Sequence, residues 1–485
     1  MEPYKELNKQ YIDGVWRDGR EDDTIQDINP YDNSVLVEIN CAGLAELNEA
    51  YEAAQRAGVT WAALLPQERR DVLLKAADIL LARKDEFAHW IAQEAGGAHA
   101  KGEIEVMLAR EVIIEASTFP SRLHGFILPS SIPGKESRVY RKPLGVIGII
   151  SPWNFPVHLS MRSIAPALGC GNAIVVKPAS QTPVTGGTLL AKLFEEAGLP
   201  KGVFNVVVGK SSVIGDPFVA HPIPKLISFT GSTPVGKGIG KLAGENLKKV
   251  ALELGGNNVF IVLEDADIDQ AVAAAMMGKF MHQGQICMAV NRFLVHEAVY
   301  GEFCGKLVER TKALKVGDPR DRDTDIGPLI DEKQVKRIQK DIEESVAQGA
   351  KIECGGQAEG AVLYPTVMTN VRNNMPIAHN EIFGPVAPVI AFKDEQELLK
   401  LANELDFGLS GALHTRNVER GVQLARQVET GMIHVNDQSV NDEPNAPFGG
   451  ERESGLGRFG GEWVMDEMTR VQWVSVQHEP RQYPI

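Results

Sequence analysis

Two kinds of hydrophobic pattern divide the chain. From about Leu44 to Thr118, apolar residues recur at intervals of three and four, with glycines at the ends of the runs, which predicts amphipathic helices. From Gly145 onward, short β-branched runs such as GVIGII, AIVVKP and NVFIVL alternate with helical stretches. Continuous apolar runs suit strands that are buried on both faces, so we expect a parallel sheet covered by helices.

A second α/β section is predicted from about Gly256 to Gly455. It holds the helix candidate IDQAVAAAMMGKFMHQG, the strand NRFLVHE and the unit VAPVIAF–DEQELLKLANEL–GLSGALHT. The segment 121–142 is expected to form a polar hairpin, and the tail VQWVSVQ a final strand. Because these two pieces lack the apolar residues for a core of their own, we expect their edges to pair with another subunit.

Composition narrows the class of protein. A chain of 485 residues, 44% hydrophobic and 24% charged, is typical of a globular protein with two or three domains. The formal charge of −14 argues against binding to nucleic acid or to an anionic membrane surface. The N-terminus has no apolar signal region, and no apolar run is long enough to span a bilayer. We therefore expect a cytoplasmic protein.

The cysteines carry further information. The five cysteines are odd in number, scattered and without CxxC spacing, which favours reduced thiols over disulfides or a zinc site. No cluster of His, Cys and Asp has metal-ligand spacing, so no metal is proposed.

One of these thiols, Cys287, lies in the segment GQIC, and upstream Glu253 lies in LELGG. A thiol can hold a substrate carbonyl as a covalent adduct, and a carboxylate can activate the water that releases the product.

Neither residue decides the chemistry alone, since a lone Cys is usually a small buried hydrophobe and a lone Glu a surface charge. The same holds for GSTPVG, residues 231–236, which follows the apolar run KLISFT and opens a helical stretch. A glycine lets the backbone approach a phosphate, and a helix N-terminus offers free N–H groups. On its own this segment is more often an ordinary turn, and no GxGxxG follows the first strand.

The neighbouring segments change this balance. SPWNFP, KPASQTP, FTGSTPVG, LELGG, GQIC, EIFGPV and PFGG occur in one order from Ser151 to Gly450. Together they resemble the NAD(P)-dependent aldehyde dehydrogenase superfamily, and within it the bacterial benzaldehyde and vanillin dehydrogenases. The resemblance implies an α/β fold with a parallel-sheet cofactor domain (1–120 and 143–254), an α/β catalytic domain (255–455) and a small bridging sheet (121–142 and 456–485). It also implies a homo-oligomer, either dimer or tetramer.

The resemblance also assigns roles to residues. Cys287 attacks the aldehyde, the Asn154 amide and the Cys287 backbone N–H stabilise the oxyanion, and Glu253 activates the hydrolytic water. A lysine at position 177 contacts the adenosine ribose, and Glu381 binds the nicotinamide ribose hydroxyls beside Phe383. The residues implied to bind the cofactor are Ile150, Trp153, Lys177, Ser180, Gly209, Gly231, Ser232, Gly236, Leu254, Glu381 and Phe383.

One departure concerns cofactor choice. NAD-restricted relatives often carry a glutamate three positions after the lysine, where its charge repels a 2′-phosphate. This chain has Ser180 at that position, so we expect NADP to be accepted as well as NAD.

A substrate funnel is expected beyond Asn154. Its implied members are Phe155, Leu159, Arg162, Met288 and Phe448. An apolar, aromatic-lined channel suits a flat ring, so benzaldehyde-like and hydroxylated substrates such as vanillin are favoured. Arg162 is left open between a pocket residue and an interdomain salt-bridge residue, because Arg is seldom buried without a partner.

Three other functions are alternatives to an aromatic aldehyde dehydrogenase. An aliphatic aldehyde or semialdehyde dehydrogenase, succinic semialdehyde included, uses the same chemistry, and Arg162 alone does not separate these substrates. A coenzyme-A-acylating enzyme does not need a general base, so Glu253 favours hydrolysis. A catalytically silent binding protein of the same fold is disfavoured by the joint presence of Asn154, Glu253 and Cys287.

Overall fold

The helical periodicity of the N-terminal third is confirmed in the computed structural model, which describes residues 1–484. Pro66 at the first turn of the second helix suits a position that needs no backbone donor, and Gly96, with φ 65°, ends the third. The four helices are α1 (Leu44–Ala63), α2 (Pro66–Ala82), α3 (Lys84–Ala95) and α4 (His99–Arg122).

The apolar runs of the next section form the centre of an eight-stranded sheet in the order β2-β1-β9-β8-β7-β10-β11-β23. The five central strands are parallel and the strands at both edges are antiparallel. The strands are β1 (Gln10–Ile12), β2 (Val15–Arg17), β7 (Val146–Ile150), β8 (Ala173–Lys177), β9 (Phe204–Val206), β10 (Leu226–Thr230), β11 (Lys249–Glu253) and β23 (Gly455–Leu456).

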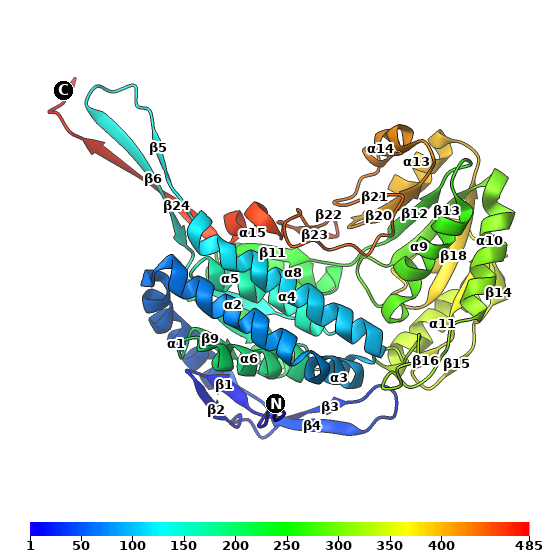
Figure 1. Ribbon diagram of the computed structural model, residues 1–485, viewed down its shortest axis with the longest axis horizontal. Coiled ribbons are helices and arrows are strands. Elements are labelled where there is room, and N and C mark those ends of the chain that lie inside the picture. Colours follow the sequence, from blue (N-terminus) through cyan, green and yellow to red (C-terminus); the bar gives the residue numbers. More distant parts are fainter. Residues whose placement is uncertain (485) are drawn as a thin grey trace.

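Helices cover both faces of this sheet, as its apolar strands require. Helices α1, α7 and α8 pack together on one face, and α5 and α6 lie on the other beneath α2 and α4 (Figure 1). The added elements are α5 (Pro156–Gly169), the π-helical turn η1 (Val184–Thr188), α6 (Leu189–Ala197), α7 (Ser211–Ala220) and α8 (Thr233–Glu245).

The strand order places one edge of this sheet in a favourable position for a ligand. Along the chain, β7, β8 and β9 run outward in one direction, whereas β10 and β11 lie on the other side of β7. The order therefore reverses between β7 and β10, which pair directly. In open parallel sheets, ligands bind outside the carboxyl ends of the strands at such a reversal.

A second sheet of seven strands, in the order β14-β17-β18-β13-β12-β20-β21, begins directly after β11. All of its neighbouring strands are parallel except β14 and β17. The strands are β12 (Asn258–Val262), β13 (Val290–His296), β14 (Lys351–Cys354), β17 (Thr366–Thr369), β18 (Val386–Phe392), β20 (Gly411–His414) and β21 (His434–Val435).

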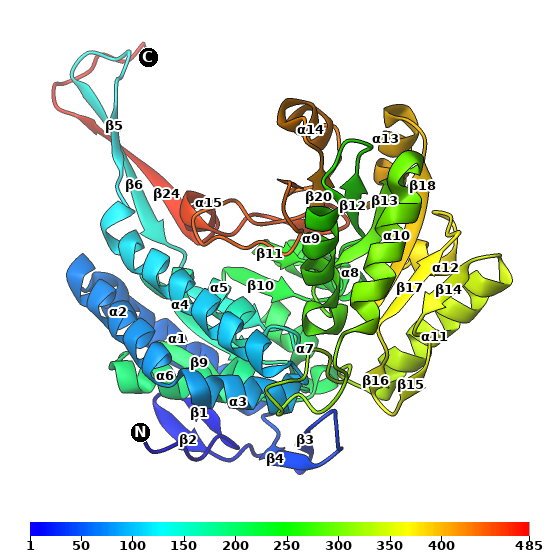
Figure 2. The same cartoon turned by 45° about the vertical axis from the view of Figure 1, so that its right-hand side comes forward.

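Two separate apolar clusters fill the two faces of the second sheet. Helices α9 and α10 cover one face, while α11, α13 and α14 contribute to the cluster on the other. Figures 1 and 2 show the two α/β units side by side. The helical elements are α9 (Ile268–Phe280), η2 (Met281–Gly284), α10 (Glu297–Lys312), α11 (Glu332–Ala347), α12 (Pro376–His379), α13 (Glu395–Asn403) and α14 (Val418–Ala425).

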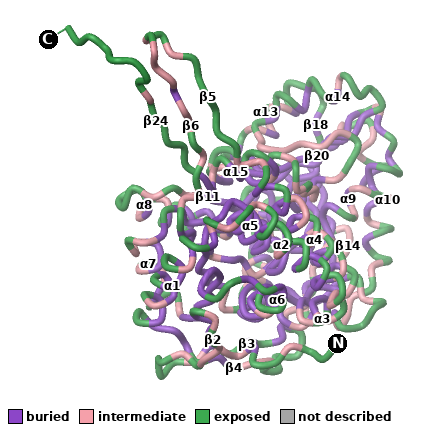
Figure 3. Tube along the Cα trace, turned by 60° about the vertical axis from the view of Figure 1, so that its left-hand side comes forward, coloured by how far each residue is buried: buried purple, intermediate pink, exposed green. Residues whose placement is uncertain are grey.

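The predicted polar hairpin and final strand pair with each other in a three-stranded antiparallel sheet that projects from the first unit. The register runs from Thr469 opposite Pro143 to Gln477 opposite Lys135. This arm is mostly exposed, in contrast to the buried body (Figure 3). Its strands are β5 (Phe126–Leu128), β6 (Lys135–Pro143) and β24 (Thr469–Gln477), with α15 (Gly461–Glu467) before the last.

Short antiparallel pairs complete the structure, and the hydrophobic pattern did not single them out. Four of these strands are only two residues long, which is too short for a periodicity to be recognised in a sequence. The pairs are β3 (Thr24–Ile28) with β4 (Val35–Asn40), β15 (Ala358–Glu359) with β16 (Val362–Leu363), and β19 (Phe407–Gly408) with β22 (Glu451–Arg452).

Candidate active site

The carboxyl edge of the first sheet gathers several predicted site residues. Ile150 ends β7 opposite Lys177 at the end of β8, and Thr230 ends β10 opposite Glu253 at the end of β11. The predicted segments SPWNFP, KPASQTP, GSTPVG and LELGG are therefore the loops and strand ends at this edge. Because these strands are parallel, residues far apart in the sequence meet there.

Lys177 is almost completely buried at this edge. Its Nζ donates to Ser211 Oγ at 3.0 Å, and burial lowers its pKa to about 8. Ser180 is half-buried in the loop that follows, and Gly209 is buried after β9. A buried amine with a single hydroxyl partner retains donors for further hydroxyl groups, such as those of a ribose.

The segment GSTPVG forms the N-terminus of helix α8. Ser232 is the N-cap residue, and its exposed side chain makes no capping hydrogen bond. Gly236, one turn into the helix, packs against Leu254, so the helix approaches the segment that follows β11. An uncapped N-terminus with free N–H groups fits an anionic group such as a dinucleotide phosphate.

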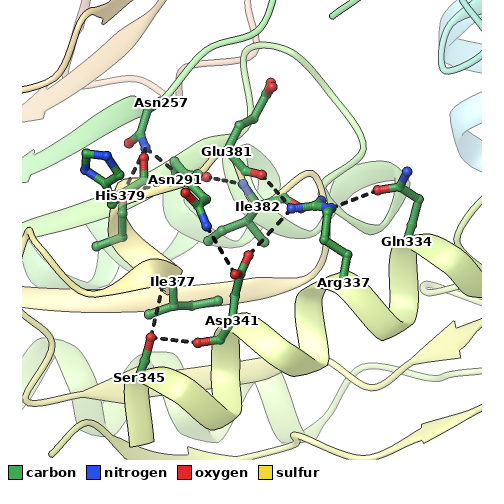
Figure 4. Close-up of polar contacts among 12 residues, drawn as sticks. Asn257, Asn291, Gln334, Arg337, Asp341, Ser345, Ile377, His379, Glu381 and Ile382 are labelled. Atoms are coloured by element: carbon green, nitrogen blue, oxygen red, sulfur yellow. Dashed lines mark hydrogen bonds and ion pairs between the residues drawn. The ribbon is translucent and has the colours of Figure 1, made fainter. Parts of the chain in front are cut away.

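The loop that carries Glu381 comes from the second unit and is held firmly (Figure 4). Arg337 on α11 donates to the Glu381 carbonyl at 3.0 Å, and Asn291 accepts from the Ile382 N–H at 2.8 Å. The Glu381 carboxylate in turn accepts from the Gly256 N–H at 3.0 Å. Burial raises the Glu381 pKa to about 7. A carboxylate fixed in this way is a suitable acceptor for two ribose hydroxyls.

Two aromatic rings join the units near this loop. Trp153, after β7, meets Phe383 edge-to-face, with ring centroids 5.4 Å apart. Phe383 has φ 50°, a left-handed conformation that costs a bulky residue on the order of 1–3 kcal/mol. Such strain is concentrated at sites where a side chain must be aimed in a set direction.

The backbone before Cys287 is strained as well. His282 and Gln283 are consecutive residues with φ 48° and 54°, and they lie between α9 and Cys287. The side chain of Asn258, at the start of β12, donates to the carbonyl of Cys287 at 2.7 Å and to that of Ala289 at 2.8 Å. The loop of Cys287 is therefore fixed by hydrogen bonds to the second sheet.

Glycines bring the Glu253 segment against this loop. A Cβ on Gly256 would lie 2.7 Å from the Cys287 carbonyl oxygen, and one on Gly255 would lie 2.4 Å from a Glu381 carboxylate oxygen. No side chain fits at either place without displacing its neighbour. Gly255 and Gly256 therefore let the backbone that follows Glu253 approach the loop of Cys287 and the Glu381 carboxylate closely.

Asn154 lies just before helix α5, and its amide donates to the Gln285 carbonyl at 3.0 Å. The buried ion pair between Lys101 and Glu105 supports the backbone around Asn154. Glu105 on α4 accepts from the Val157 N–H at 2.7 Å and pairs with Lys101, whose Nζ donates to the Asn154 carbonyl at 2.9 Å. The acidic group at the start of α5 complements the positive end of that helix.

Glu253 is only 1% exposed, and within residues 1–484 neither of its carboxylate oxygens has a hydrogen-bond partner. Burial raises its pKa to about 8, against the opposing charge of Arg162, whose nearest nitrogen is 3.8 Å away. Burial also raises the Cys287 pKa to about 12, with Arg162 again opposing it. Burial therefore favours the neutral form of both groups at pH 7.

A cavity of about 250 Å³ opens at Cys287. Asn154 lines it, as do the predicted substrate residues Phe155, Leu159 and Met288. Its other apolar lining residues are Ile104, Leu108, Met277, Met281, Ile286 and Val440. Polar side chains gather on the loop before PFGG, namely Gln438, Asn441, Asp442 and Glu443, with His158 of α5.

The two other predicted substrate residues lie apart from this lining. The Arg162 guanidinium stacks on the Phe448 ring at 3.8 Å, and both side chains are buried. Arg162 also donates to Asp442 at 3.1 Å. Of the two alternatives left open for Arg162, the ion pair is the one present in the structure.

Sequence reasoning missed several residues that hold the site together. Asn258, Lys101, Glu105 and His158 are buried polar residues in contact with it, and the side chain of Asp442 is 5% exposed. The first four had only one signal in the sequence, a polar residue inside an apolar helix or strand pattern, and Asp442 lies in a loop without such a pattern. That signal shows neither the partner nor the purpose.

Residues 1–484 contain neither a cluster of metal-ligating side chains nor a helix suited to a membrane. No group of three or more His, Cys, Asp or Glu side chains is placed to hold a metal ion. In the same part of the chain, no helix combines the length and apolarity needed to cross a membrane.

Comparison with known proteins places the chain in a family. Residues 16–474 match the aldehyde dehydrogenase family. A benzaldehyde dehydrogenase of Bacillus subtilis is 50% identical over 100% of both chains, and a vanillin dehydrogenase of Corynebacterium glutamicum is 48% identical over 97% of this chain and 98% of its own. The crystal structure of a salicylaldehyde dehydrogenase from Pseudomonas putida superimposes with a TM-score of 0.96 at 36% identity, covering 98% of this chain and 99% of that one. The chain belongs to the aldehyde dehydrogenase family and is an NAD(P)-dependent aldehyde oxidoreductase with the fold of that family.

Proposed function

We propose that the enzyme oxidises aromatic aldehydes to their carboxylic acids with NAD or NADP. The observation that carries this proposal is the apolar cavity of about 250 Å³ that opens at Cys287. An apolar cavity of roughly 150 Å³ holds a benzene ring in another protein interior, so this one has room for a substituted ring. Relatives that act on benzaldehyde and vanillin support the same substrate class.

The polar end of the cavity supports ring-hydroxylated substrates over anionic ones. Asp442 and Glu443 line it beside His158, and Arg162 lies outside the lining and is paired. Among residues 1–484, no lysine or arginine lines the cavity to bind the carboxylate of succinic semialdehyde, whereas the acidic side chains can accept a hydrogen bond from a ring hydroxyl. We therefore place benzaldehyde and vanillin above succinic semialdehyde and short aliphatic aldehydes.

The first half of the proposed reaction uses Cys287 and Asn154. The Cys287 thiolate attacks the carbonyl carbon to form a thiohemiacetal, and the negative charge moves to the former carbonyl oxygen. The Asn154 amide and the Cys287 backbone N–H donate to that oxygen. Loss of the hydride from the same carbon leaves a thioester on Cys287.

The bound nicotinamide supplies the hydride acceptor. The fit of a dinucleotide rests on the free N-terminus of α8, on the buried Lys177 amine and on the fixed Glu381 carboxylate. The α8 N-terminus suits a phosphate, the Lys177 amine suits the adenosine ribose, and the Glu381 carboxylate suits the nicotinamide ribose. We infer that the first unit (1–120 and 143–254) is the cofactor domain and that 255–455 carries the nucleophile.

The second half of the reaction uses Glu253. Its carboxylate takes a proton from water, the hydroxide attacks the thioester carbonyl, and the acid leaves as the Cys287 thiolate is restored. A buried carboxylate with no competing hydrogen bonds is available for such a water. Hydrolysis, in place of transfer to coenzyme A, follows from the presence of this base.

A panel of aldehydes tests the substrate assignment. We expect kcat/KM for benzaldehyde and vanillin to exceed that for hexanal and succinic semialdehyde, and Cys287→Ala to abolish NADH formation with all of them. A kcat/KM for hexanal or succinic semialdehyde about tenfold above that for benzaldehyde would show that the substrate class is wrong. Product analysis with and without coenzyme A separates hydrolysis from acyl transfer.

We also propose that the enzyme is a homo-oligomer. The projecting arm exposes a row of large apolar side chains, which a monomer would leave in water. These are Phe126, Ile127, Leu128, Val471 and Trp473. Sedimentation velocity of the purified chain distinguishes dimer from tetramer, and a monomer at micromolar concentration would contradict the proposal.

The five cysteines support a reducing compartment. All of them are free thiols, and four are buried. Free thiols with a reactive Cys287 favour the cytoplasm, where thiols stay reduced. Cell fractionation with an antibody tests this proposal, and recovery outside the cytoplasm would contradict it.

A further inference from the structure

Arg162 is held in one orientation beside Glu253. Its guanidinium stacks on the ring of Phe448 at 3.8 Å, and its Nη1 donates to Asp442 at 3.1 Å. The other terminal nitrogen, Nη2, lies 3.8 Å from the Glu253 carboxylate and has no hydrogen-bond partner within residues 1–484. The guanidinium is planar and is held at Nη1 and at one face, so Nη2 points in a fixed direction.

Asp442 provides this orientation together with His158. Its carboxylate accepts from His158 Nε2 at 2.8 Å as well as from Arg162, and the two donors lie one turn apart on α5. Burial opposes the charge of Asp442, but Arg162 and His158 hold its pKa below the usual value. Asp442 is therefore an anion that compensates the buried cation while leaving Nη2 unoccupied.

The same cation acts on both candidate catalytic groups. Burial favours the neutral forms of Cys287 and Glu253, and Arg162 is the largest influence that favours the anion in each case. Other charges also act on these groups. Asp442 opposes Arg162 at both, Glu253 and Glu381 raise the Cys287 pKa, and Arg458 lowers that of Glu253.

We propose that Arg162 is a positioning residue that stabilises the anionic forms of Cys287 and Glu253 across the back wall of the cavity, and that Asp442 limits this effect. The inference rests on the proposed function of those two residues. Arg162 does not line the cavity, so it acts through its neighbours and not by contact with the aldehyde. An arrangement in which one cation serves both groups supports each half of the reaction in turn.

The test combines three variants with two readouts. Arg162→Met removes the charge, Arg162→Lys keeps it, and Asp442→Asn frees the guanidinium from its anion. The first readout is the pH dependence of Cys287 alkylation by iodoacetamide, which needs no substrate. The second is the pH dependence of steady-state benzaldehyde oxidation.

We expect Arg162→Met to shift both profiles to higher pH by about one unit, which lowers the alkylation rate at neutral pH about tenfold. Arg162→Lys keeps the positive charge, so both profiles should lie close to those of wild type. Asp442→Asn should shift both profiles to lower pH. The KM for benzaldehyde should stay within about twofold of wild type in Arg162→Lys, since Arg162 does not line the cavity. Arg458→Met is the matched comparison, since Arg458 also favours the anion of Glu253, so it should shift the steady-state profile to higher pH.

Three results would overturn the inference. The first is an unchanged pH profile in a folded Arg162→Met protein. The second is a raised KM with unchanged kcat, which indicates direct contact with substrate. The third is a shift in the same direction in Arg162→Met and Asp442→Asn, which indicates a structural role alone. If Arg162→Met does not fold, the test rests on Asp442→Asn, whose two pH profiles should shift to lower pH. Failure of the proposed function would appear separately, as wild-type enzyme without aldehyde oxidation but with pH-dependent alkylation.

Discussion

The steady-state rate should rise with pH because Glu253 must be ionised to act as a base. Burial in the apolar site raises its pKa to about 8. At pH 7 roughly a tenth of the enzyme then carries the anionic base, and at pH 9 roughly nine-tenths does. If thioester hydrolysis limits turnover, kcat increases about tenfold between these two pH values and levels off above them.

Stopped-flow measurement of NADH absorbance at saturating benzaldehyde separates the two halves of the reaction. A burst of NADH reports formation of the thioester on Cys287, and the linear phase reports its hydrolysis. In Glu253→Gln we expect the burst to remain and the linear phase to be slow and independent of pH over this range. Glu245→Gln, an exposed carboxylate at the end of α8, is the matched control and should retain the wild-type profile.

Two outcomes would refute this reasoning. A linear phase in wild type that does not change between pH 7 and pH 9 means that Glu253 is ionised throughout or that hydrolysis is not limiting. A rise of the same size in Glu253→Gln means that another group or hydroxide supplies the base. Loss of the burst in Glu253→Gln would show that Glu253 also activates Cys287, whose pKa burial raises to about 12.

Three further substitutions test other parts of the site. Asn258→Asp removes the donors to the backbone of Cys287, so we expect a slower burst and a lower thermal midpoint, each unmet buried carbonyl costing about 1–3 kcal/mol. Arg337→Gln loosens the loop of Glu381, so the KM for NAD should rise several-fold while kcat changes less. Ser180→Glu places a carboxylate beside the predicted adenosine ribose site, so kcat/KM for NADP should fall at least about tenfold relative to NAD. In each case, unchanged kinetics with a folded protein would contradict the expectation.

Much of the fold was predictable because its signals are local. The runs ending at Ile150 and Lys177 are continuous and apolar, and both form strands buried on two faces. Once they are recognised as parallel strands, their carboxyl ends must lie at one edge of the sheet, which brings distant loops together. The position of Glu253 was not predicted in this way, because the strand KVALE is only partly buried and the apolar pattern did not single it out.

The supporting contacts of the site were not predictable, because they pair residues that no local pattern connects. Lys101 lies in a helix 53 residues before the Asn154 carbonyl that it contacts. Asn258 starts an apolar strand and holds a loop 29 residues later. The left-handed backbone of His282 also carries no signal, since histidine has no special preference for it comparable to that of glycine.

The role of Arg162 could not be decided from the sequence alone. A buried guanidinium needs an anion, so an ion pair was a sound alternative to a pocket role from the start. No local pattern singles out the partner among 64 acidic residues, and Asp442 lies 280 positions away. Only the fold shows that the partner leaves one nitrogen facing Glu253. The residue therefore gains a candidate role in catalysis from its orientation, and its orientation comes from a residue that belongs to no recognised motif.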